Sequence, residues 1–279
     1  MEQRRADAHN LLKRVISALI LIPFALGAIY YGHPVFDLLV LVGFIILLHE
    51  WVGLCGARQD ILLAGIIYGT GGLSLIVVSL LGIVWGGAIF GAGFVAVLIL
   101  SAGLRNRPRP AENAAVPAFG FFYLSGAVFF LLVLRGDPTV GLKLVLFLFL
   151  VSWASDTGAY VFGRLIGGPK MAPVLSPNKT WAGLFGGVLC GAGIGAGFAV
   201  ILDTPALGVL IGAGTILGIV SQGGDLLESY MKRRFHVKDA GNLIPGHGGL
   251  LDRVDSLLAL SWVSGLVYWL ARDKVLLWM

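Results

Sequence analysis

The chain has 279 residues, of which 57% are hydrophobic and 13% are charged, and its mean hydropathy is +0.90. About a quarter of the residues in a soluble domain are charged, so this composition excludes a water-soluble globular protein. The net charge of +5 does not indicate nucleic-acid binding, because Lys and Arg accumulate on the cytoplasmic side of membrane proteins. Cys55 and Cys190 lie far apart in apolar sequence, which predicts neither a disulfide nor a metal site.

A helix that crosses a bilayer needs about 20 apolar residues. The first candidate follows a basic amino terminus, and we interpret it as a retained span because no small-residue cleavage site follows it. The uncharged run 61–104 would reach about 66 Å as one helix, roughly twice the hydrocarbon thickness, so it must turn near Gly82, Gly86 and Gly87. The sequence thus predicts an all-α, polytopic integral membrane protein with about nine transmembrane helices, at 15–31, 35–54, 61–80, 83–104, 115–134, 142–162, 181–202, 205–224 and 250–270.

The distribution of basic residues predicts the orientation of these spans. If the amino terminus is cytoplasmic and nine spans alternate, the cytoplasmic segments hold sixteen of the 20 basic residues. This positive-inside bias supports a cytoplasmic amino terminus and, with nine spans, a carboxyl terminus on the outer side. We expect a multi-pass protein of the cell's inner (plasma) membrane with its active site facing the cytoplasm.

The polar motifs divide the chain into two functional regions. Residues 1–150 are mostly plain hydrophobic sequence, which predicts about five amino-terminal transmembrane helices that form a scaffold and face lipid. Residues 151–279 concentrate the polar motifs, and we expect a carboxy-terminal catalytic transmembrane region with cytoplasmic loops. The 41 glycines, many of them in 186–197, predict close helix packing.

The first polar block, 152–160, places Asp156 at the cytoplasmic end of a span. A carboxylate at mid-bilayer costs about 3 kcal/mol and less near the interface. Asp156 therefore either faces a protein cavity and a partner or is a solvated helix end.

The second polar block, Ser176-Pro177-Asn178-Lys179-Thr180, precedes the span 181–202. Pro177 and Asn178 predict a turn, and Thr180 predicts a helix cap. These structural roles leave Lys179 unexplained, and a cation beside the free N–H groups of a helix end favours an anion contact.

The third polar block carries most of the charged residues that point to chemistry. On a helix, Asp225, Glu228, Ser229 and Lys232 share one face, and Asp252, Asp255 and Ser256 repeat the same spacing. Carboxylate oxygens without a cysteine or histidine cluster suit magnesium or manganese rather than zinc. The intervening loop has glycines at 241, 246, 248 and 249, whose backbone N–H groups can approach phosphate oxygens.

The alternative for this block is an amphipathic segment that binds anionic lipid headgroups. It explains Lys232, Arg233 and Arg234, but not three aspartates in the same place. His247, within the glycine loop, fits either a phosphate contact or a backbone hydrogen bond. Cations, carboxylates and a glycine loop together favour phosphoryl or nucleotidyl transfer.

This pattern resembles the phosphatidate cytidylyltransferases, also called CDP-diacylglycerol synthases. The blocks at 153–160 and 176–180 resemble two upstream motifs of that family, and the resemblance covers about 152–256. After Trp181 the family commonly has Glu-Gly, whereas this chain has Ala182-Gly183, so position 182 is left out of the expected site. The carboxy-terminal signature is matched with its spacing intact by Ser229, Lys232, Arg233, Lys238, Asp239, Gly241, Ile244, His247, Gly248, Gly249, Asp252, Arg253 and Asp255.

The resemblance implies that the chain transfers the cytidylyl group of CTP to phosphatidate, giving CDP-diacylglycerol and pyrophosphate. The implied cofactor is Mg²⁺, with Mn²⁺ as the alternative and room for a second cation. The implied catalytic residues are Asp225, Asp252, Asp255, Lys232, Arg233 and His247. The implied substrate-binding residues are Ser176, Asn178, Lys179, Ser229, Lys238, Asp239, Gly248, Gly249 and Arg253, and the implied metal ligands are Asp225, Asp252, Asp255, Asp156 and Glu228.

The implied partners are CTP, phosphatidate and the bilayer, without nucleic acid, and a homodimer is compatible with the resemblance. Which basic residues bind CTP and which bind lipid stays open. Two other functions are weighed: a membrane transferase that acts on another lipid phosphate, and an ion-coupled transporter with Asp156 and Glu50 as coupling carboxylates. The clustering of charge at one face and the absence of an inverted repeat argue against the transporter, and we expect Glu50 to lie at the interface.

Overall fold

The computed structural model describes residues 22–103, 115–241 and 248–278. Among these residues, eight helices are long and apolar enough to cross a membrane, so the chain is an all-α polytopic membrane protein, as its hydrophobic pattern predicts. In chain order the elements are a short helix Ile22–Tyr31, α2 (Val35–Leu54), η1 (Ala57–Gln59), α3 (Ile61–Leu81), α4 (Ile83–Gly103), α5 (Ala115–Arg135), α6 (Gly141–Leu165), β1 (Lys170–Ala172), β2 (Ser176–Thr180), α7 (Trp181–Ile201), α8 (Leu207–Arg234) and α9 (Leu251–Trp278).

The helix boundaries follow the predicted spans closely from α2 to α7. The helices α8 and α9 have 28 residues each and are longer than predicted. The helix α8 continues from apolar sequence into the polar site motif, whereas α9 continues past a kink at Ala271 to Trp278, at the end away from the site. Of the first predicted span, 15–31, residues 15–21 lie outside the described part of the chain. The helix α6 runs across residues 150 and 151, and the functional division proposed there stays a prediction.

The long uncharged run turns where its glycines predict. Gly82 separates α3 from α4 and has a φ of +90°, a conformation that residues with a side chain rarely adopt. Its N–H donates to the carbonyl of Val78 at 3.1 Å, which closes the last turn of α3. The two helices then run back against each other.

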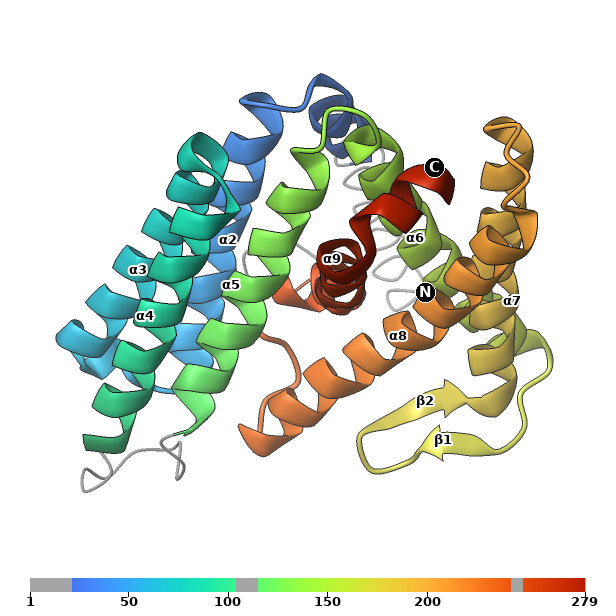
Figure 1. Cartoon of the computed structure of the whole chain (residues 1–279). Coiled ribbons are helices and arrows are strands. Elements are labelled where there is room, and N and C mark those ends of the chain that lie inside the picture. Colours follow the sequence, from blue (N-terminus) through green and yellow to red (C-terminus); the bar gives the residue numbers. More distant parts are fainter. Residues whose placement is uncertain (1–21, 104–114, 242–247, 279) are drawn as a thin grey trace.

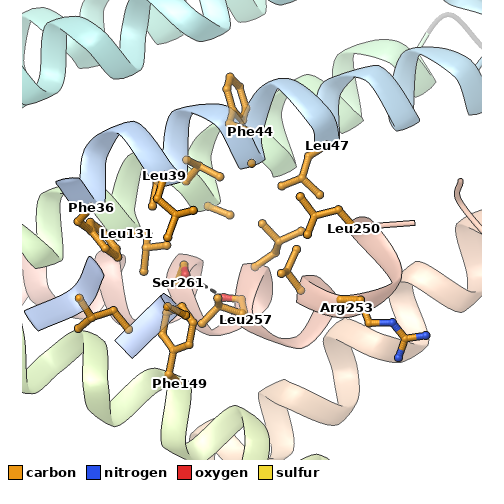
Figure 2. Close-up of a pocket in the computed structure, with 18 of the residues that line it drawn as sticks. Phe36, Leu39, Phe44, Leu47, Leu131, Phe149, Leu250, Arg253, Leu257 and Ser261 are labelled. Carbon is orange, nitrogen blue, oxygen red and sulfur yellow. Dashed lines mark hydrogen bonds between the residues drawn. The ribbon is translucent and has the colours of Figure 1, made fainter. Parts of the chain in front are cut away.

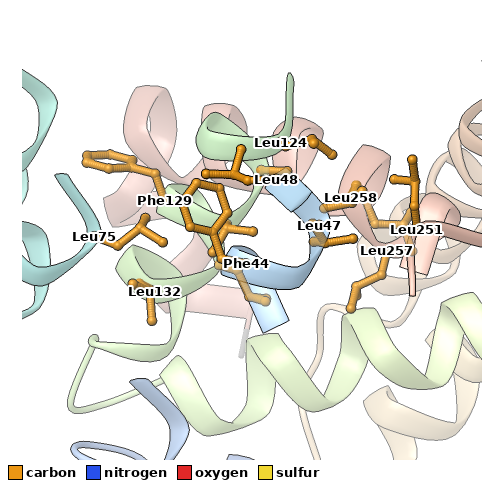
Figure 3. Close-up of a cluster of buried hydrophobic side chains, with 14 of the residues drawn as sticks. Phe44, Leu47, Leu48, Leu75, Leu124, Phe129, Leu132, Leu251, Leu257 and Leu258 are labelled. Carbon is orange, nitrogen blue, oxygen red and sulfur yellow. The ribbon is translucent and has the colours of Figure 1, made fainter. Parts of the chain in front are cut away.

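The helices form two groups with α9 between them (Figure 1). The helices α2 to α5 lie on one side, α6 to α8 with the β-hairpin lie on the other, and α9 contacts both α5 and α8. Figure 3 shows the buried side chains that join α9 to the first group, including Phe44, Leu124, Leu251 and Leu258. The start of α9 is thus held by packing from both sides.

Glycines bring the backbones of α7 and α8 into contact, as the glycine-rich sequence predicts. A Cβ on Gly214 would overlap the carbonyl oxygen of Gly191, and a Cβ on Gly195 would overlap that of Leu210. Lipid tails are as apolar as leucine, so helices in a bilayer associate through such close packing rather than through a hydrophobic driving force. This packing fixes α8, which carries half of the site motifs.

The second polar block forms a strand, so the predicted turn at Pro177 and Asn178 is wrong. These residues lie in β2, which pairs antiparallel with β1, and the turn is at 173–175 instead. A two-stranded hairpin has only edge strands, where a proline is tolerated because one side of each strand needs no ladder donor. The predicted cap is confirmed, since the Thr180 hydroxyl oxygen accepts from the N–H of Gly183 at 3.1 Å.

A buried carboxylate ties the loop between α5 and α6 to the far end of α9. Asp137 accepts hydrogen bonds from Tyr268 at 2.5 Å and from Arg272 at 2.9 Å, and it also accepts from the Thr139 backbone and hydroxyl. Burial alone would raise the pKa of Asp137, but these hydrogen bonds outweigh it and hold the pKa below its ordinary range. The contact anchors the end of α9 that lies away from the polar motifs.

Candidate functional site

Three carboxylates from α8 and α9 meet at the cytoplasmic end predicted for these helices. Asp225 and Glu228 lie one turn apart on α8, Asp255 comes from α9, and one ligand oxygen from each lies within 4.8 Å of the other two. The shared helix face predicted for Asp225, Glu228 and Ser229 is confirmed, since the Ser229 hydroxyl donates to Asp225 at 3.4 Å. Three carboxylates this close repel one another unless a proton or a nearby cation reduces their charge.

A glycine makes this approach of α8 and α9 geometrically feasible. A Cβ on Gly224 would lie 2.8 Å from both the Asp255 carbonyl oxygen and the Ala259 Cβ. Because Gly224 directly precedes Asp225, the backbones are closest where the carboxylates gather. Any side chain at this position would push α9 away and widen the cluster.

Two lysines neutralise the carboxylates. Lys179, from β2, lies 2.7 Å from an Asp225 oxygen, and Lys232, from α8, lies 2.6 Å from Glu228 and 2.7 Å from Asp252. Both lysine side chains are largely buried, as are Glu228 and Asp252. In such surroundings a charge without a partner is costly, so each lysine stabilises the carboxylates that it contacts.

Asp252 organises the start of α9 and lies outside the three-carboxylate cluster. It accepts from Lys232, from the Gly249 N–H at 2.8 Å and from the Ala240 N–H at 3.0 Å. A carboxylate at the first turn of a helix also interacts favourably with the helix dipole. Asp252 therefore holds Lys232 and the two ends of the glycine loop.

Asp156 lies where α6 meets α8 and α9. It is exposed, and one of its oxygens accepts from the hydroxyls of Ser221 at 3.5 Å and Ser256 at 3.4 Å. The neighbouring Gln222 donates to the Ser155 hydroxyl at 3.3 Å. Of the two interpretations from sequence, the contacts match a carboxylate with protein partners, although Asp156 is not part of the three-carboxylate cluster.

The remaining predicted site residues surround this centre at various distances from it. Arg233 donates to the carbonyls of Leu175 and Val237, so it fastens the β-hairpin to the end of α8. His247 lies outside the described residues. Gly248 has a φ of +82°, and a Cβ there would lie 2.9 Å from an Asp252 oxygen. Ser176, Gly248 and Gly249 are partly or fully buried, whereas Asn178, Lys238, Asp239 and Arg253 are exposed.

Glu50 also lies in this region, and the sequence pattern did not reveal that it does. It is only 5% exposed, and its two oxygens accept from the N–H groups of Leu250 and Leu251, each at 2.8 Å. Glu50 thus caps α9 from α2, rather than lying at the membrane interface as expected. The signal available in the sequence was a carboxylate near the end of an apolar span, which does not identify a partner 200 residues away.

The described residues fit a divalent cation. The Oε1 atom of Glu228 is buried and has no hydrogen-bond partner among them, and it belongs to a residue of the three-carboxylate cluster. Oxygen-only ligand sets suit hard cations such as Mg²⁺. A cation there would satisfy this oxygen and reduce the repulsion between the carboxylates.

Comparisons with known proteins identify a matching family and several relatives. The model of the cytidylyltransferase family matches residues 12–271. A phosphatidate cytidylyltransferase of Brucella suis biovar 1 is 39% identical over 251 residues, which cover 90% of each chain. The phosphatidate cytidylyltransferase of Staphylococcus saprophyticus is 50% identical over 119 residues, or 42% of this chain and 46% of its own.

Proposed function

This chain belongs to the cytidylyltransferase family, and we propose that it transfers the cytidylyl group of CTP to phosphatidate. It is a membrane-embedded nucleotidyltransferase that acts in CDP-diacylglycerol synthesis. The observation that carries the specific reaction is the meeting of three carboxylates and two lysines at the junction of α8, α9 and β2. This arrangement supports a reaction between two polyanions.

The proposed reaction does not require a strong general base. A phosphate monoester has its second pKa near 6, so a phosphatidate oxygen is already anionic at neutral pH. That oxygen forms a bond to the α-phosphorus of CTP while the bond from this phosphorus to the bridging oxygen breaks, and pyrophosphate leaves with the electron pair. The obstacle is the repulsion between two negatively charged reactants, which fixed positive charge lowers.

The two buried lysines supply that positive charge. Lys179 and Lys232 are largely buried, and each is held by a carboxylate at 2.7 Å or less. Charge-assisted hydrogen bonds from lysine to phosphate are about twice as strong as neutral ones. We propose that Lys179 and Lys232 bind phosphate oxygens of the substrates, and that Asp252 positions Lys232.

We further propose that Asp225, Glu228 and Asp255 hold Mg²⁺. When bound, the cation supplies charge stabilisation for phosphate oxygens. The protein should therefore be active with magnesium or manganese and stay active with a zinc-specific chelator. Loss of activity in that chelator, restored only by zinc, would contradict this assignment.

We propose that the site faces the cytoplasm. The positive-inside bias supports a cytoplasmic location for the segment that carries Lys232, Arg233, Arg234 and Lys238. CTP would then arrive from the cytoplasm and phosphatidate from the cytoplasmic leaflet of the inner membrane. A homodimer stays a prediction.

The deciding experiment is an assay of purified protein with radiolabelled CTP. We expect label in the lipid fraction when phosphatidate is present and no label when it is absent. Incorporation into a different lipid phosphate alone would indicate another membrane transferase. No incorporation with any acceptor would refute the proposed reaction.

A further inference from the structure

Two apolar cavities lie against α9, on different stretches of the helix. The first, shown in Figure 2, is lined on α9 by Arg253, Leu257 and Ser261 among others. The second has a volume of about 330 Å³ and is formed by α6, α8 and the later turns of α9, with Leu134 from α5. Ligand-binding cavities usually have roughly 300–1,000 Å³. We propose that the second cavity binds one acyl chain of an anionic phospholipid from the leaflet opposite the carboxylates, as a structural lipid and not as a substrate.

The second cavity lies too far from the carboxylates to hold a reacting group. On α8 its lining ends at Leu217, eight residues before Asp225. On α9 its lining begins at Val263, eight residues after Asp255. At 1.5 Å per residue, both intervals are about 12 Å. The lining on α8 starts at Val209, close to the end of the helix that lies away from the carboxylates, so the cavity belongs to the opposite half of the membrane.

The cavity opens onto the surface that faces lipid. Val209, Ile216 and Val267 line it and are 40%, 58% and 44% exposed. On membrane-spanning helices, exposed apolar side chains contact lipid tails, which are as apolar as leucine. The cavity is therefore continuous with the interface between protein and lipid. A hydrocarbon chain is the ligand that such a lining accepts at the lowest desolvation cost.

A kink in α9 places the end of this helix against the cavity. Ala271 has the non-helical backbone angles φ −140° and ψ 35°, and beyond it Val275 and Trp278 line the cavity. Figure 1 shows this last part of α9 turning away from the axis of the helix. Tryptophan is enriched at the level of the lipid headgroups. The position of Trp278 therefore fits a headgroup at this end of the cavity.

The same end of α9 carries charge that favours an anionic headgroup. Arg272 pairs with Asp137 at 2.9 Å, but the Asp137 side chain is 0% exposed whereas that of Arg272 is 55% exposed. The pair thus presents its cationic side to the surroundings. Lys274 and Asp273 are exposed as well, so the exposed charge of this segment stays positive. Arg272 also donates to the hydroxyl of Tyr268, a lining residue, at 2.8 Å, which places the guanidinium at the rim of the cavity.

A bound acyl chain would complete the packing between α6, α8 and α9. Atoms that line a void lose dispersion contacts on that side, and a chain in the cavity restores them. Because the cavity is about 12 Å along α8 and α9 from the carboxylates, the chain should stabilise the fold without entering the reaction. The inference is therefore independent of the proposed function.

Gly212 offers a way to fill the cavity from α8. It lines the cavity, and a Cβ there would have nothing within 4 Å. Gly212→Phe would therefore place a ring where the acyl chain lies. Gly208→Phe, one turn earlier on α8, is the matched control, because a Cβ at Gly208 also has nothing within 4 Å and Gly208 is not among the described residues that line the cavity. Gly212→Leu repeats the test if the phenylalanine variant does not fold.

Native mass spectrometry of the purified protein in detergent measures bound lipid without turnover. With dioleoyl phosphatidylglycerol and dioleoyl phosphatidylcholine at equal concentrations, the unaltered protein should retain phosphatidylglycerol in preference. Because overpacking excludes the chain, Gly212→Phe should retain about tenfold less phosphatidylglycerol than Gly208→Phe. Added phosphatidylglycerol should raise the melting temperature of Gly208→Phe but not that of Gly212→Phe. Equal retention by the two variants, or no preference between the two lipids in the unaltered protein, would overturn the inference.

Lys274→Gln tests the headgroup separately from the acyl chain. A cation near a lipid phosphate is worth about a fivefold gain in affinity, so this change should lower the preference for phosphatidylglycerol about fivefold. Asp273→Asn removes the neighbouring negative charge and should not lower the preference. An unchanged preference in Lys274→Gln would contradict the anionic headgroup. If Gly212→Phe instead breaks a dimer and leaves bound phosphatidylglycerol unchanged, the cavity is a contact between two copies of the chain, and the inference is overturned.

Discussion

Replacing Glu50 with glutamine tests whether α2 positions the catalytic end of α9. The carboxylate accepts two backbone N–H groups at 2.8 Å each, from Leu250 and Leu251. Glutamine keeps the shape and one acceptor, but its amide nitrogen would face the second N–H. A hydrogen bond to a charged group is worth about 1.5–3 kcal/mol, so we expect a loss of about 2 kcal/mol at this contact.

Hydrogen exchange measures this loss at the place where it occurs. A decrease of about 2 kcal/mol in the local opening free energy should speed amide exchange in the peptide containing Leu250 and Leu251 by roughly 30-fold. Because Asp255 follows one turn later, turnover should fall while the KM for CTP changes little. Asp203→Asn is the control, since Asp203 has a φ of +48°, a conformation that asparagine also adopts.

Two results would refute this reasoning. Unchanged exchange at the start of α9 in Glu50→Gln would mean that the two hydrogen bonds do not hold the helix there. Faster exchange with unchanged turnover would mean that α9 is held, but that its position does not matter for catalysis. Glu50→Asp should restore part of the protection, because the charge remains although the shorter side chain reaches less far.

Asp225→Asn and Asp255→Asn should each lower turnover by about 10³-fold, which corresponds to an activation barrier higher by roughly 4 kcal/mol. Both variants should also gain less thermal stability than the unaltered protein when magnesium is added. Near-normal cytidylyl transfer in either variant would disprove the role of the three-carboxylate cluster. Because the pKa of Asp137 is lowered in the folded protein, ionised Asp137 should contribute its full stabilisation above the ordinary aspartate pKa and less as the pH falls below it. Unfolding measured from pH 6 to pH 3 should therefore depend less on acid in Asp137→Asn than in the unaltered protein. Cysteines at Lys238 and Pro138 should react with membrane-impermeant reagents from opposite sides, and labelling from one side would contradict the proposed orientation.

The hydrophobic spans and the shared helix faces could be predicted because both depend on neighbouring residues. The length of α2 follows from its own apolar run, and the common face of Asp225 and Glu228 follows from their spacing on α8. The close packing of α7 was also predictable, because glycine is the local cause of it.

The contacts that the sequence did not reveal all join distant segments. Glu50 caps a helix that begins 200 residues later, and no local pattern specifies that pairing. The turn expected at Pro177 became a strand because β1 supplies a pairing partner. Only the fold shows that Asp252 contacts Lys232 and the backbone of Ala240 and Gly249, and the metal-binding role expected for it stays a prediction.

The contact between α7 and α8 divides glycines that look alike in the sequence into two kinds. At Gly191, Gly195 and Gly214 an added methyl group would lie within 3 Å of backbone atoms of the other helix, whereas at Gly193 and Gly197 it would enter open space. Natural drift should therefore replace Gly193 and Gly197 freely with alanine or larger residues and leave the other three unchanged. The same alternation sets the safe positions for attaching spectroscopic probes to α7, since labels on its open side would report on the surrounding lipid without moving α8.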